Sequence, residues 1–182
     1  MENLITSSFL KAGDCKTMLA EKDALRNLGS GFLLGLGFVA FIDEAVFHQM
    51  LHWHHFYDLS TTSAGLISDG LFHAFSWFAT AGSLFMLADL RRKKTWQKTR
   101  WWGGVFLGAG AFQLYDGIIQ HKVMRIHQIR YNVNLVPYDL TWNLVAVVLI
   151  LIGAGLVCKI NIKEKQPNDV SVAGRRSSTS PV

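Results

Sequence analysis

The chain has 182 residues, of which 50% are apolar or aromatic and 17% are charged. This length allows one domain, and the composition excludes an intrinsically disordered chain. The net charge of +5 would suggest nucleic-acid binding if the basic residues formed a stripe on a polar domain, but they lie between long apolar runs. We therefore expect no nucleic-acid partner and predict that the chain is embedded in a lipid bilayer.

Four stretches are long and apolar enough to cross a bilayer, which takes about 20 residues of helix. They are residues 28–51, 66–90, 102–123 and 138–158. The last stretch has no polar residue between Leu144 and Ile152, whereas each of the other three carries an aspartate and at least one histidine. The sequence therefore predicts an all-α integral membrane protein with a four-span domain over residues 28–158.

The basic residues are distributed unevenly between the connections. Segments 1–27, 91–100 and 159–182 carry 4, 6 and 5 lysines or arginines, whereas the connection 56–65 carries none. Because loops rich in Lys and Arg stay in the cytoplasm, we expect both termini to be cytoplasmic and the protein to lie in the cytoplasmic (inner) membrane. Residues 1–27 are then an N-terminal cytoplasmic segment without a removable signal peptide, and residues 159–182 a disordered cytoplasmic tail.

The sequence repeats itself with an offset of 73 residues. The pattern G-x3-G-x-G-x5-D-x4-H-x5-H starts at Gly31 in the first copy and at Gly104 in the second. The next span of each copy carries D-x3-H from Asp69 and D-x3-N from Asp139. Because each copy is two helices long, we predict a four-helix bundle of two tandem two-helix repeats, related by a pseudo-twofold axis along the membrane normal. The glycines are expected to let the first and third spans approach closely.

The repeated acidic and histidine residues form a candidate functional site. Ionisable side chains inside a membrane cost several kcal/mol unless they are paired or bound, so they usually mark function. Imidazole and carboxylate groups bind transition metals, and helical bundles build such sites from inward-facing side chains. We predict a site for copper, iron or zinc in the outer half of the bundle. Its candidate ligands are Asp43, His48, His54, Asp69, His73, Asp116, His121 and His127.

The expected positions of these residues along the membrane normal indicate which of them lie at the same level. At a rise of about 1.5 Å per residue, Asp43 lies level with His73, and His48 lies level with Asp69. On an ideal α-helix, however, His48 is turned well away from Asp43. The sequence therefore does not bring all candidate ligands to one point.

Several short blocks resemble those of a known family. Its signature blocks are similar to Phe41-Ile42-Asp43, His48-Gln49, Trp53-His54-His55, Asp69-Gly70-Leu71-Phe72-His73 and Ile126-His127-Gln128-Ile129-Arg130. The family consists of bacterial four-span membrane proteins of unknown function, and the resemblance covers roughly residues 29–158. It implies no activity, although it associates the chain with the assembly of respiratory oxidases. Lys122 and Gln128 stand where the family pattern has a second histidine, which removes ligands from the second copy.

Several functions remain open, and the sequence does not decide whether the chain is an enzyme. A metal ion would serve redox chemistry or metal handling on the outer side of the membrane. Histidines on facing helices could instead ligate a b-type haem, and the spacing His48-x3-His52-x-His54-His55 is also found in di-iron hydroxylases. A structural role for the Asp and His pairs, in an assembly, scaffold or proton-linked protein, is the remaining alternative. A second copy of the chain and a respiratory membrane complex are the partners under consideration.

Overall fold

The computed structural model describes the backbone of residues 2–176 and the side chains of residues 17–164. Within this part the chain forms four long helices and no strand. These are α1 (Glu2–Asp43), α2 (Thr62–Arg92), α3 (Lys98–Tyr115) and α4 (Val136–Arg176). Two of them continue into π-helical segments, η1 (Glu44–Met50) after α1 and η2 (Asp116–Met124) after α3. The predicted all-α fold is confirmed.

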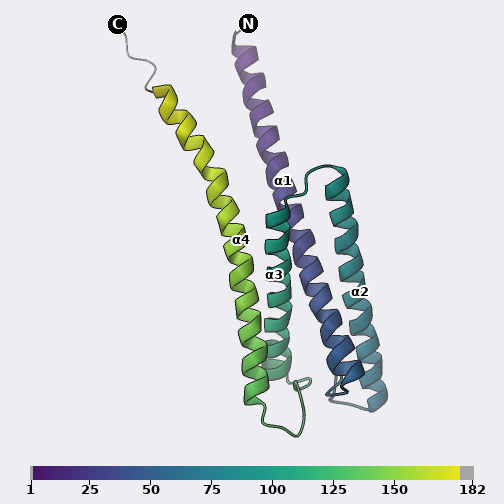
Figure 1. Ribbon diagram of the computed structural model, residues 1–182. Coiled ribbons are helices and arrows are strands. Elements are labelled where there is room, and N and C mark those ends of the chain that lie inside the picture. The colour runs from purple at the N-terminus through teal and green to yellow at the C-terminus, as the bar shows by residue number, and fades with distance from the viewer. Residues whose placement is uncertain (1, 177–182) are drawn as a thin grey trace.

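The helices stand side by side in the order α4, α3, α1, α2 (Figure 1). α1 and α3 pack against each other in the middle, α2 packs on the outer flank of α1, and α4 packs on the outer flank of α3. In the described part of the chain, the backbone of α2 approaches neither α3 nor α4. The four helices thus form an open row rather than a bundle closed on itself, and grooves remain along the row.

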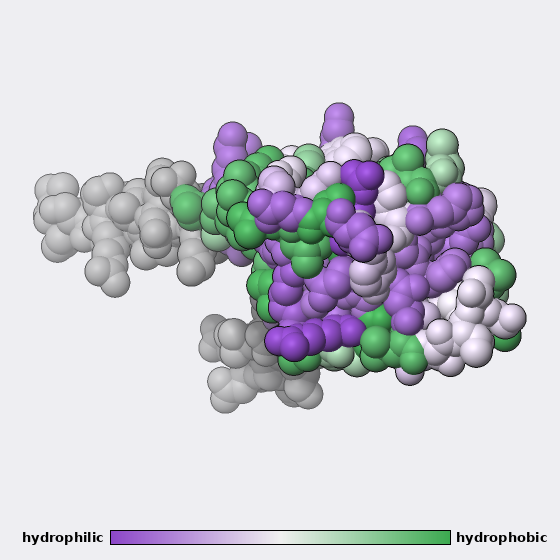
Figure 2. All heavy atoms as spheres, turned by 90° about the horizontal axis from the view of Figure 1, so that it is seen from below, coloured by the Kyte–Doolittle hydropathy of each residue, from purple (hydrophilic) through white to green (hydrophobic). Residues whose placement is uncertain are grey.

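The two ends of the row differ in composition. The start of α1, the connection 93–97 and the end of α4 lie at one end, which we call the basic end (Figure 1). The connections 51–61 and 125–135 lie at the opposite end, which we call the histidine end. Figure 2 looks onto the histidine end and shows hydrophilic residues gathered across it, with hydrophobic residues at the rim. A polar cap on an apolar helical body is the arrangement expected where helices leave a membrane.

The long helices extend beyond the predicted spans at the basic end. α1 already begins at Glu2, so the predicted N-terminal segment 1–27 is largely the start of this helix. α4 continues past residue 158 to Arg176, through most of the segment predicted to be disordered. Residues 177–182 of that predicted tail lie outside the described residues.

Three helical stretches are long and apolar enough to cross a membrane, namely Thr17–Met50, Thr62–Arg92 and Val136–Glu164. The predicted third span, which falls on α3 and η2, is not among them. It contains glycines, aromatic residues and polar residues among its apolar ones. This helix lies between α1 and α4 and is buried along much of its length. Its composition therefore suits contact with other helices rather than with lipid.

Glycines bring the backbones of α1 and α3 into direct contact. A Cβ atom at any of four glycines would collide with a carbonyl oxygen of the opposite helix. The collisions are Gly31 with Trp101, Gly104 with Leu28, Gly35 with Val105, and Gly108 with Phe32. The partners exchange roles at the same offset of 73 residues that the sequence shows. The predicted close approach of the first and third helices is confirmed.

A buried asparagine ties the α2–α3 connection to α1 at the basic end. The Nδ2 group of Asn27 donates to the carbonyl oxygen of Thr95 at 2.9 Å, and its Oδ1 accepts from the backbone N–H of Gln97 at 2.7 Å. Close by, the Asp89 carboxylate lies 2.6 Å from the Arg26 guanidinium. These contacts fix the axial position of α2 and α3 relative to α1, and thereby the heights of their polar residues.

We predict that Gly35→Ala and Gly108→Ala each destabilise the protein by about 1–3 kcal/mol, because the added methyl group collides with backbone atoms that cannot rotate away. Thermal unfolding in detergent, followed by circular dichroism, measures the effect. Gly29→Ala is the matched control, since nothing lies within 4 Å of a Cβ at that position. Equal unfolding temperatures for Gly35→Ala and Gly29→Ala would contradict the predicted contact.

Candidate metal centre

The helical register changes where the candidate ligands begin. α1 becomes π-helical at Glu44 and α3 at Asp116, which are aligned positions of the repeat to within one residue. A π-helix bonds residue i to i+5, so residues five apart turn toward one face. Asp43 and His48 lie five apart, as do Asp116 and His121, and their Oδ2 and Nε2 atoms are 3.8 Å and 3.2 Å apart. The expectation that His48 points away from Asp43 was wrong because the helix is not α-helical here.

Each π segment is followed by a residue with left-handed backbone, which ends the helix. These residues are His52, with φ of 49°, and Arg125, with φ of 54°. Two residues further on, the chain buries His54 and His127, which are 6% and 1% exposed. The turn after each π segment thus returns a second histidine toward the helix that it has just left.

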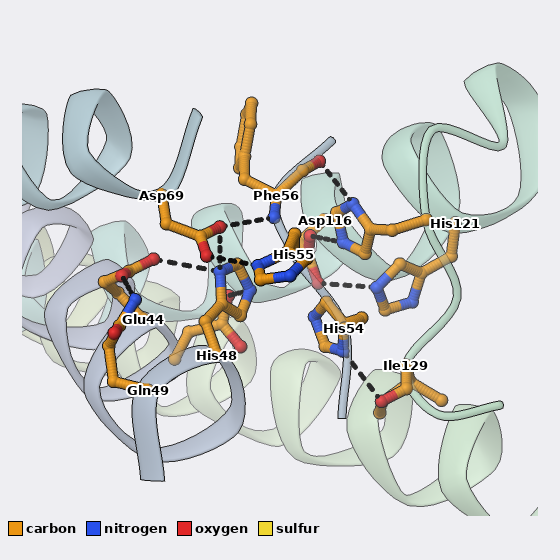
Figure 3. A network of polar contacts seen from close by, with 12 residues as sticks. Glu44, His48, Gln49, His54, His55, Phe56, Asp69, Asp116, His121 and Ile129 are labelled. Atoms are coloured by element: carbon orange, nitrogen blue, oxygen red, sulfur yellow. Dashed lines mark hydrogen bonds and ion pairs between the residues drawn. The ribbon is translucent and has the colours of Figure 1, made fainter. Parts of the chain in front are cut away.

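Four imidazoles converge at the histidine end, and we call His48, His54, His121 and His127 the four-histidine cluster. The ring centroids of His48 and His54 are 4.5 Å apart, and those of His121 and His127 are 4.7 Å apart. Between these pairs, His54 and His127 stack at 4.7 Å with an interplanar angle of 5°. Figure 3 shows His48, His54 and His121 pointing toward a common space beside Asp116.

The hydrogen bonds of His54 and His127 fix their tautomers. Nδ1 of His54 lies 3.0 Å from the carbonyl oxygen of Ile129, and Nδ1 of His127 lies 2.9 Å from that of Phe56. Because a carbonyl oxygen only accepts, Nδ1 carries a hydrogen in both rings, and the neutral form of either ring has its lone pair on Nε2. Burial, together with the neighbouring rings of His48, His127 and His121, lowers the pKa of His54 to about 2. This ring is therefore neutral, as a metal ligand must be.

The lone pairs of the cluster are left without hydrogen bonds. Nε2 of all four histidines is buried and makes no hydrogen bond to any described residue. The Asp116 oxygens lie 3.2 Å from Nε2 of His121 and 3.4 Å from Nε2 of His127, but outside hydrogen-bonding geometry. Most buried polar atoms in proteins are hydrogen-bonded, so four such nitrogens in one place require an explanation.

Three overlapping groups of side chains have the spacing that a metal ion needs. They are His54, His121 and His127; Asp43, His48 and His54; and Glu44, His48 and Asp69. In each group the ligand atoms lie within 4.8 Å of one another, and every residue is buried. Ligands at about 2.0–2.2 Å from one ion lie about 3–4 Å apart, so small side-chain rotations would close these groups around an ion.

Asp69 of α2 joins the first copy of the site from the side. Its carboxylate accepts from the backbone N–H of Phe56 at 2.7 Å, and lies 2.6 Å from Nδ1 of His55 and 3.1 Å from Nδ1 of His48 (Figure 3). The predicted match in height between His48 and Asp69 is confirmed. A carboxylate that holds Nδ1 of a histidine directs its Nε2 toward a metal. Asp69 is therefore placed to orient His48.

Glu44 and His55 are not among the predicted ligands, but they lie beside His48 and Asp69. Glu44 is 1% exposed, and its Oε2 lies 2.9 Å from Nδ1 of His48. The signals were present, because Glu44 and His48 are spaced i, i+4 and His55 belongs to the Trp-His-His block. Conversely, the structure does not bring His73 to the others. His73 is half-buried, packs against Phe41 with ring centroids 5.6 Å apart, and belongs to none of the three groups.

The second copy of the site lacks the acidic flank of the first. Gly117 stands opposite Glu44 in the repeat, and Gln128 stands opposite His55 and donates to the carbonyl oxygen of His121 at 3.1 Å. Asp139, the counterpart of Asp69, lies 2.5 Å from Nζ of Lys122. The four-histidine cluster is thus shared by both halves, whereas the carboxylates around it are concentrated on one side.

We predict that Asp69→Ala destabilises the protein, because Asp69 accepts from His48, His55 and the backbone of Phe56, and a buried donor left without an acceptor costs about 1–3 kcal/mol. Asp139→Ala is the matched control in the second copy. It removes one partly exposed ion pair, which contributes up to about 1 kcal/mol. Thermal unfolding of the two variants in detergent compares them, and equal losses would show that Asp69 does not hold the three donors.

One comparison with known protein families matches the part of the chain that contains the candidate metal centre. No curated protein and no solved structure matches the chain. A family model described as "Predicted membrane protein (DUF2243)" matches residues 30–160, a range that contains the four-histidine cluster and all three candidate ligand groups. The chain belongs to this family of membrane proteins.

Proposed function

We propose that this membrane protein holds a transition-metal ion in the four-histidine cluster and uses it for redox chemistry or metal handling. The observation that carries the proposal is the set of buried Nε2 atoms without hydrogen bonds. Leaving a buried polar atom unpaired costs about 1–3 kcal/mol, and a bound ion would remove that cost for several atoms at once. His54, His121 and His127 are the proposed core ligands, with His48, Asp43 and Asp116 beside them.

The contacts argue against a purely structural role for these residues. A structural network would pair imidazole with carboxylate or backbone on both ring nitrogens. In His54 and His127, Nδ1 is paired with a backbone carbonyl, whereas Nε2 makes no hydrogen bond to a described residue. In His121 neither nitrogen makes a hydrogen bond to a described residue. This one-sided pairing is typical of metal-ligating histidines, whose other nitrogen is held by a backbone carbonyl or a carboxylate.

Copper, iron and zinc all accept imidazole and carboxylate ligands, so the proposal extends to this class of ions. A b-type haem suits the cluster less well, since its axial histidines must face each other across a macrocycle. Here the ligand atoms of three histidines lie within 4.8 Å of one another and two of the rings are stacked. The di-iron hydroxylase pattern also loses support, because His52 is exposed and belongs to none of the ligand groups.

We further propose that the two halves are repeats related by a pseudo-twofold axis between α1 and α3, with the metal near that axis. Reciprocal contacts support this relation. Nδ1 of His54 reaches the carbonyl oxygen two residues after His127, and Nδ1 of His127 reaches the carbonyl oxygen two residues after His54. The glycine contacts between α1 and α3 are reciprocal in the same way. An ion near the axis would receive equivalent ligands from both halves.

The proposed location is the cytoplasmic membrane, with four spans, the basic end in the cytoplasm and the metal site toward the outer surface. Fifteen of the 18 lysines and arginines fall in segments 1–27, 91–100 and 159–182, which supports this orientation. A site near the outer surface would suit exchange of metal or electrons with extracytoplasmic partners. Assembly of a respiratory complex is one such role, and it rests on the family resemblance alone.

We expect the protein purified in detergent to contain transition metal in stoichiometric amount, measured by multi-element mass spectrometry together with a visible spectrum. The double variant His121→Ala/His127→Ala is expected to lose the metal, because it removes two of three core ligands. His52→Asn is the matched control. It removes an exposed histidine from the adjacent connection and introduces asparagine, which tolerates the left-handed backbone at this position.

Unchanged helical content in the variants, measured by circular dichroism, separates loss of metal from loss of fold. Wild-type protein without metal, after growth in medium supplemented with copper, iron and zinc, would overturn the proposed site. Sharp haem bands in the reduced-minus-oxidised spectrum would replace the ion with the haem alternative.

We predict that a cysteine introduced at exposed Ser60 reacts with a membrane-impermeant maleimide in intact spheroplasts, whereas one at exposed Thr99 reacts only after lysis. The background is Cys15→Ser/Cys158→Ser, which removes both native thiols. The two sites lie at opposite ends of the row, so each serves as the control for the other (Figure 1). The reverse labelling pattern would invert the proposed orientation.

A further inference from the structure

An apolar cavity of about 670 Å³ lies in the groove between α2 and α3. Its walls include four phenylalanines, Phe72 and Phe75 from α2, Phe112 from α3, and Phe56 from the connection 51–61. This volume falls within the range of about 300–1,000 Å³ that is usual for small-molecule sites, and such sites are mostly apolar with a few polar groups. The cavity exists because the backbones of α2 and α3 do not approach each other in the described part of the row.

The cavity opens sideways. Its rim includes Leu71, Phe75 and Tyr115, which are 69%, 50% and 50% exposed. In a membrane protein, side chains on the outside of such helices face lipid, so a ligand would enter from the bilayer. Any ligand of this cavity would therefore be a membrane-soluble molecule.

One buried polar side chain lies in this apolar wall. Gln120 is 4% exposed, and its Oε1 is buried without a hydrogen bond to any described residue. A primary amide offers an acceptor oxygen and two donor hydrogens. It can therefore bind either a ring hydroxyl or a ring carbonyl of a ligand.

The phenylalanine rings are arranged for a flat ligand. Phe72 stacks on Phe56 with ring centroids 4.8 Å apart, and lies 5.9 Å from Phe112 with an interplanar angle of 17°. Offset-stacked rings with centroids about 4.5–7 Å apart are the favourable arrangement, so a further flat ring would extend this set. A saturated acyl chain would gain neither this stacking nor a hydrogen bond to Gln120.

We propose that this cavity binds a membrane-soluble molecule of the quinone or quinol class, with its ring against the phenylalanines and a ring oxygen on Gln120. The proposal concerns binding and does not depend on a metal in the four-histidine cluster. The site adjoins that cluster, since the rings of Phe56 and Phe72 lie 6.1 Å from His127 and 5.8 Å from His48. A bound ring would therefore be separated from the cluster by little more than one phenylalanine.

The groove between α4 and α1 provides an internal comparison. It contains a cavity of about 520 Å³, with Phe47 at the position equivalent to Gln120 and Trp142 at the position equivalent to Phe72. Nε1 of Trp142 donates to the carbonyl oxygen of Gln113 at 2.9 Å, and the Gln113 amide donates back to the carbonyl oxygen of Trp142 at 3.1 Å. This second cavity lacks the amide at the position of Gln120, so we assign the quinone to the first cavity alone.

The test measures binding of a short-chain benzoquinone and of its reduced hydroquinone to detergent-purified protein, by quenching of tryptophan fluorescence. We expect saturable binding to the wild type at about one molecule per chain. Gln120→Leu should weaken binding about tenfold, because it removes the hydrogen bond and keeps the side-chain volume. Ala111→Phe, which places a ring in the cavity, should abolish binding while leaving Gln120 in place.

Phe47→Leu is the matched control in the other groove and should bind as the wild type does. Equal affinity of wild type and Gln120→Leu would show that the molecule only partitions into an apolar groove, and would overturn the proposal. If Phe47→Leu weakened binding as much as Gln120→Leu, the quinone would not be specific to the groove between α2 and α3, and the assignment to that groove would be overturned. All variants are measured as isolated and after chelator treatment. Quinone binding that persists in metal-free protein supports this proposal even if the metal proposal fails, and metal without quinone binding overturns this proposal alone.

Discussion

The backbones of α1 and α3 meet at Gly31, Gly35, Gly104 and Gly108, and the geometry of the histidine end follows from this contact. Lipid offers little hydrophobic drive for association between helices, so small residues that permit close backbone approach determine which helices pair. The contact sets the lateral distance between the two segments of the chain that supply all four cluster histidines. The backbone of α2 approaches only that of α1 and its π-helical continuation, and the backbone of α4 only that of α3 and its π-helical continuation, so grooves remain on both sides of the central pair.

The change to π-helix converts this helix pair into a site. In an α-helix, residues five apart point in different directions, whereas the wider π turn brings Asp43 toward His48 and Asp116 toward His121. Both π segments begin at the aspartate of the repeat, to within one residue, and both are followed by left-handed backbone at positions 52 and 125. The same distortion thus occurs at both copies of the D-x4-H pattern, and in both it brings the histidine toward the aspartate.

The two halves of the described chain differ in the residues that surround the four-histidine cluster. The first half surrounds His48 with Glu44 and Asp69, whereas the second half has Gly117 and a lysine-paired Asp139 at the equivalent positions. The grooves differ too, because only the groove between α2 and α3 has an amide at the position of Gln120. Each half thus supplies two histidines to the cluster, whereas most of the surrounding carboxylates come from the first half and the groove with the Gln120 amide lies between α2 and α3. The carboxylate of Asp69 and the proposed quinone site therefore both lie on the α2 side of the row.

Hydrophobic length and residue spacing in the sequence determined the helical class, the presence of three helices long and apolar enough to cross a membrane, the glycine contact and the grouping of Asp with His. These features depend on composition and on distance along one helix. α3, by contrast, is not among the helices that are long and apolar enough to cross a membrane, and it is buried between two other helices. Only the tertiary structure decided that the row stays open, that His73 lies beside Phe41 outside the ligand groups, and that Glu44 and His55 adjoin the cluster. The physical reason is that the helical register and the side-chain directions at the histidine end are set by contacts between segments about 73 residues apart, and no local pattern carries that information.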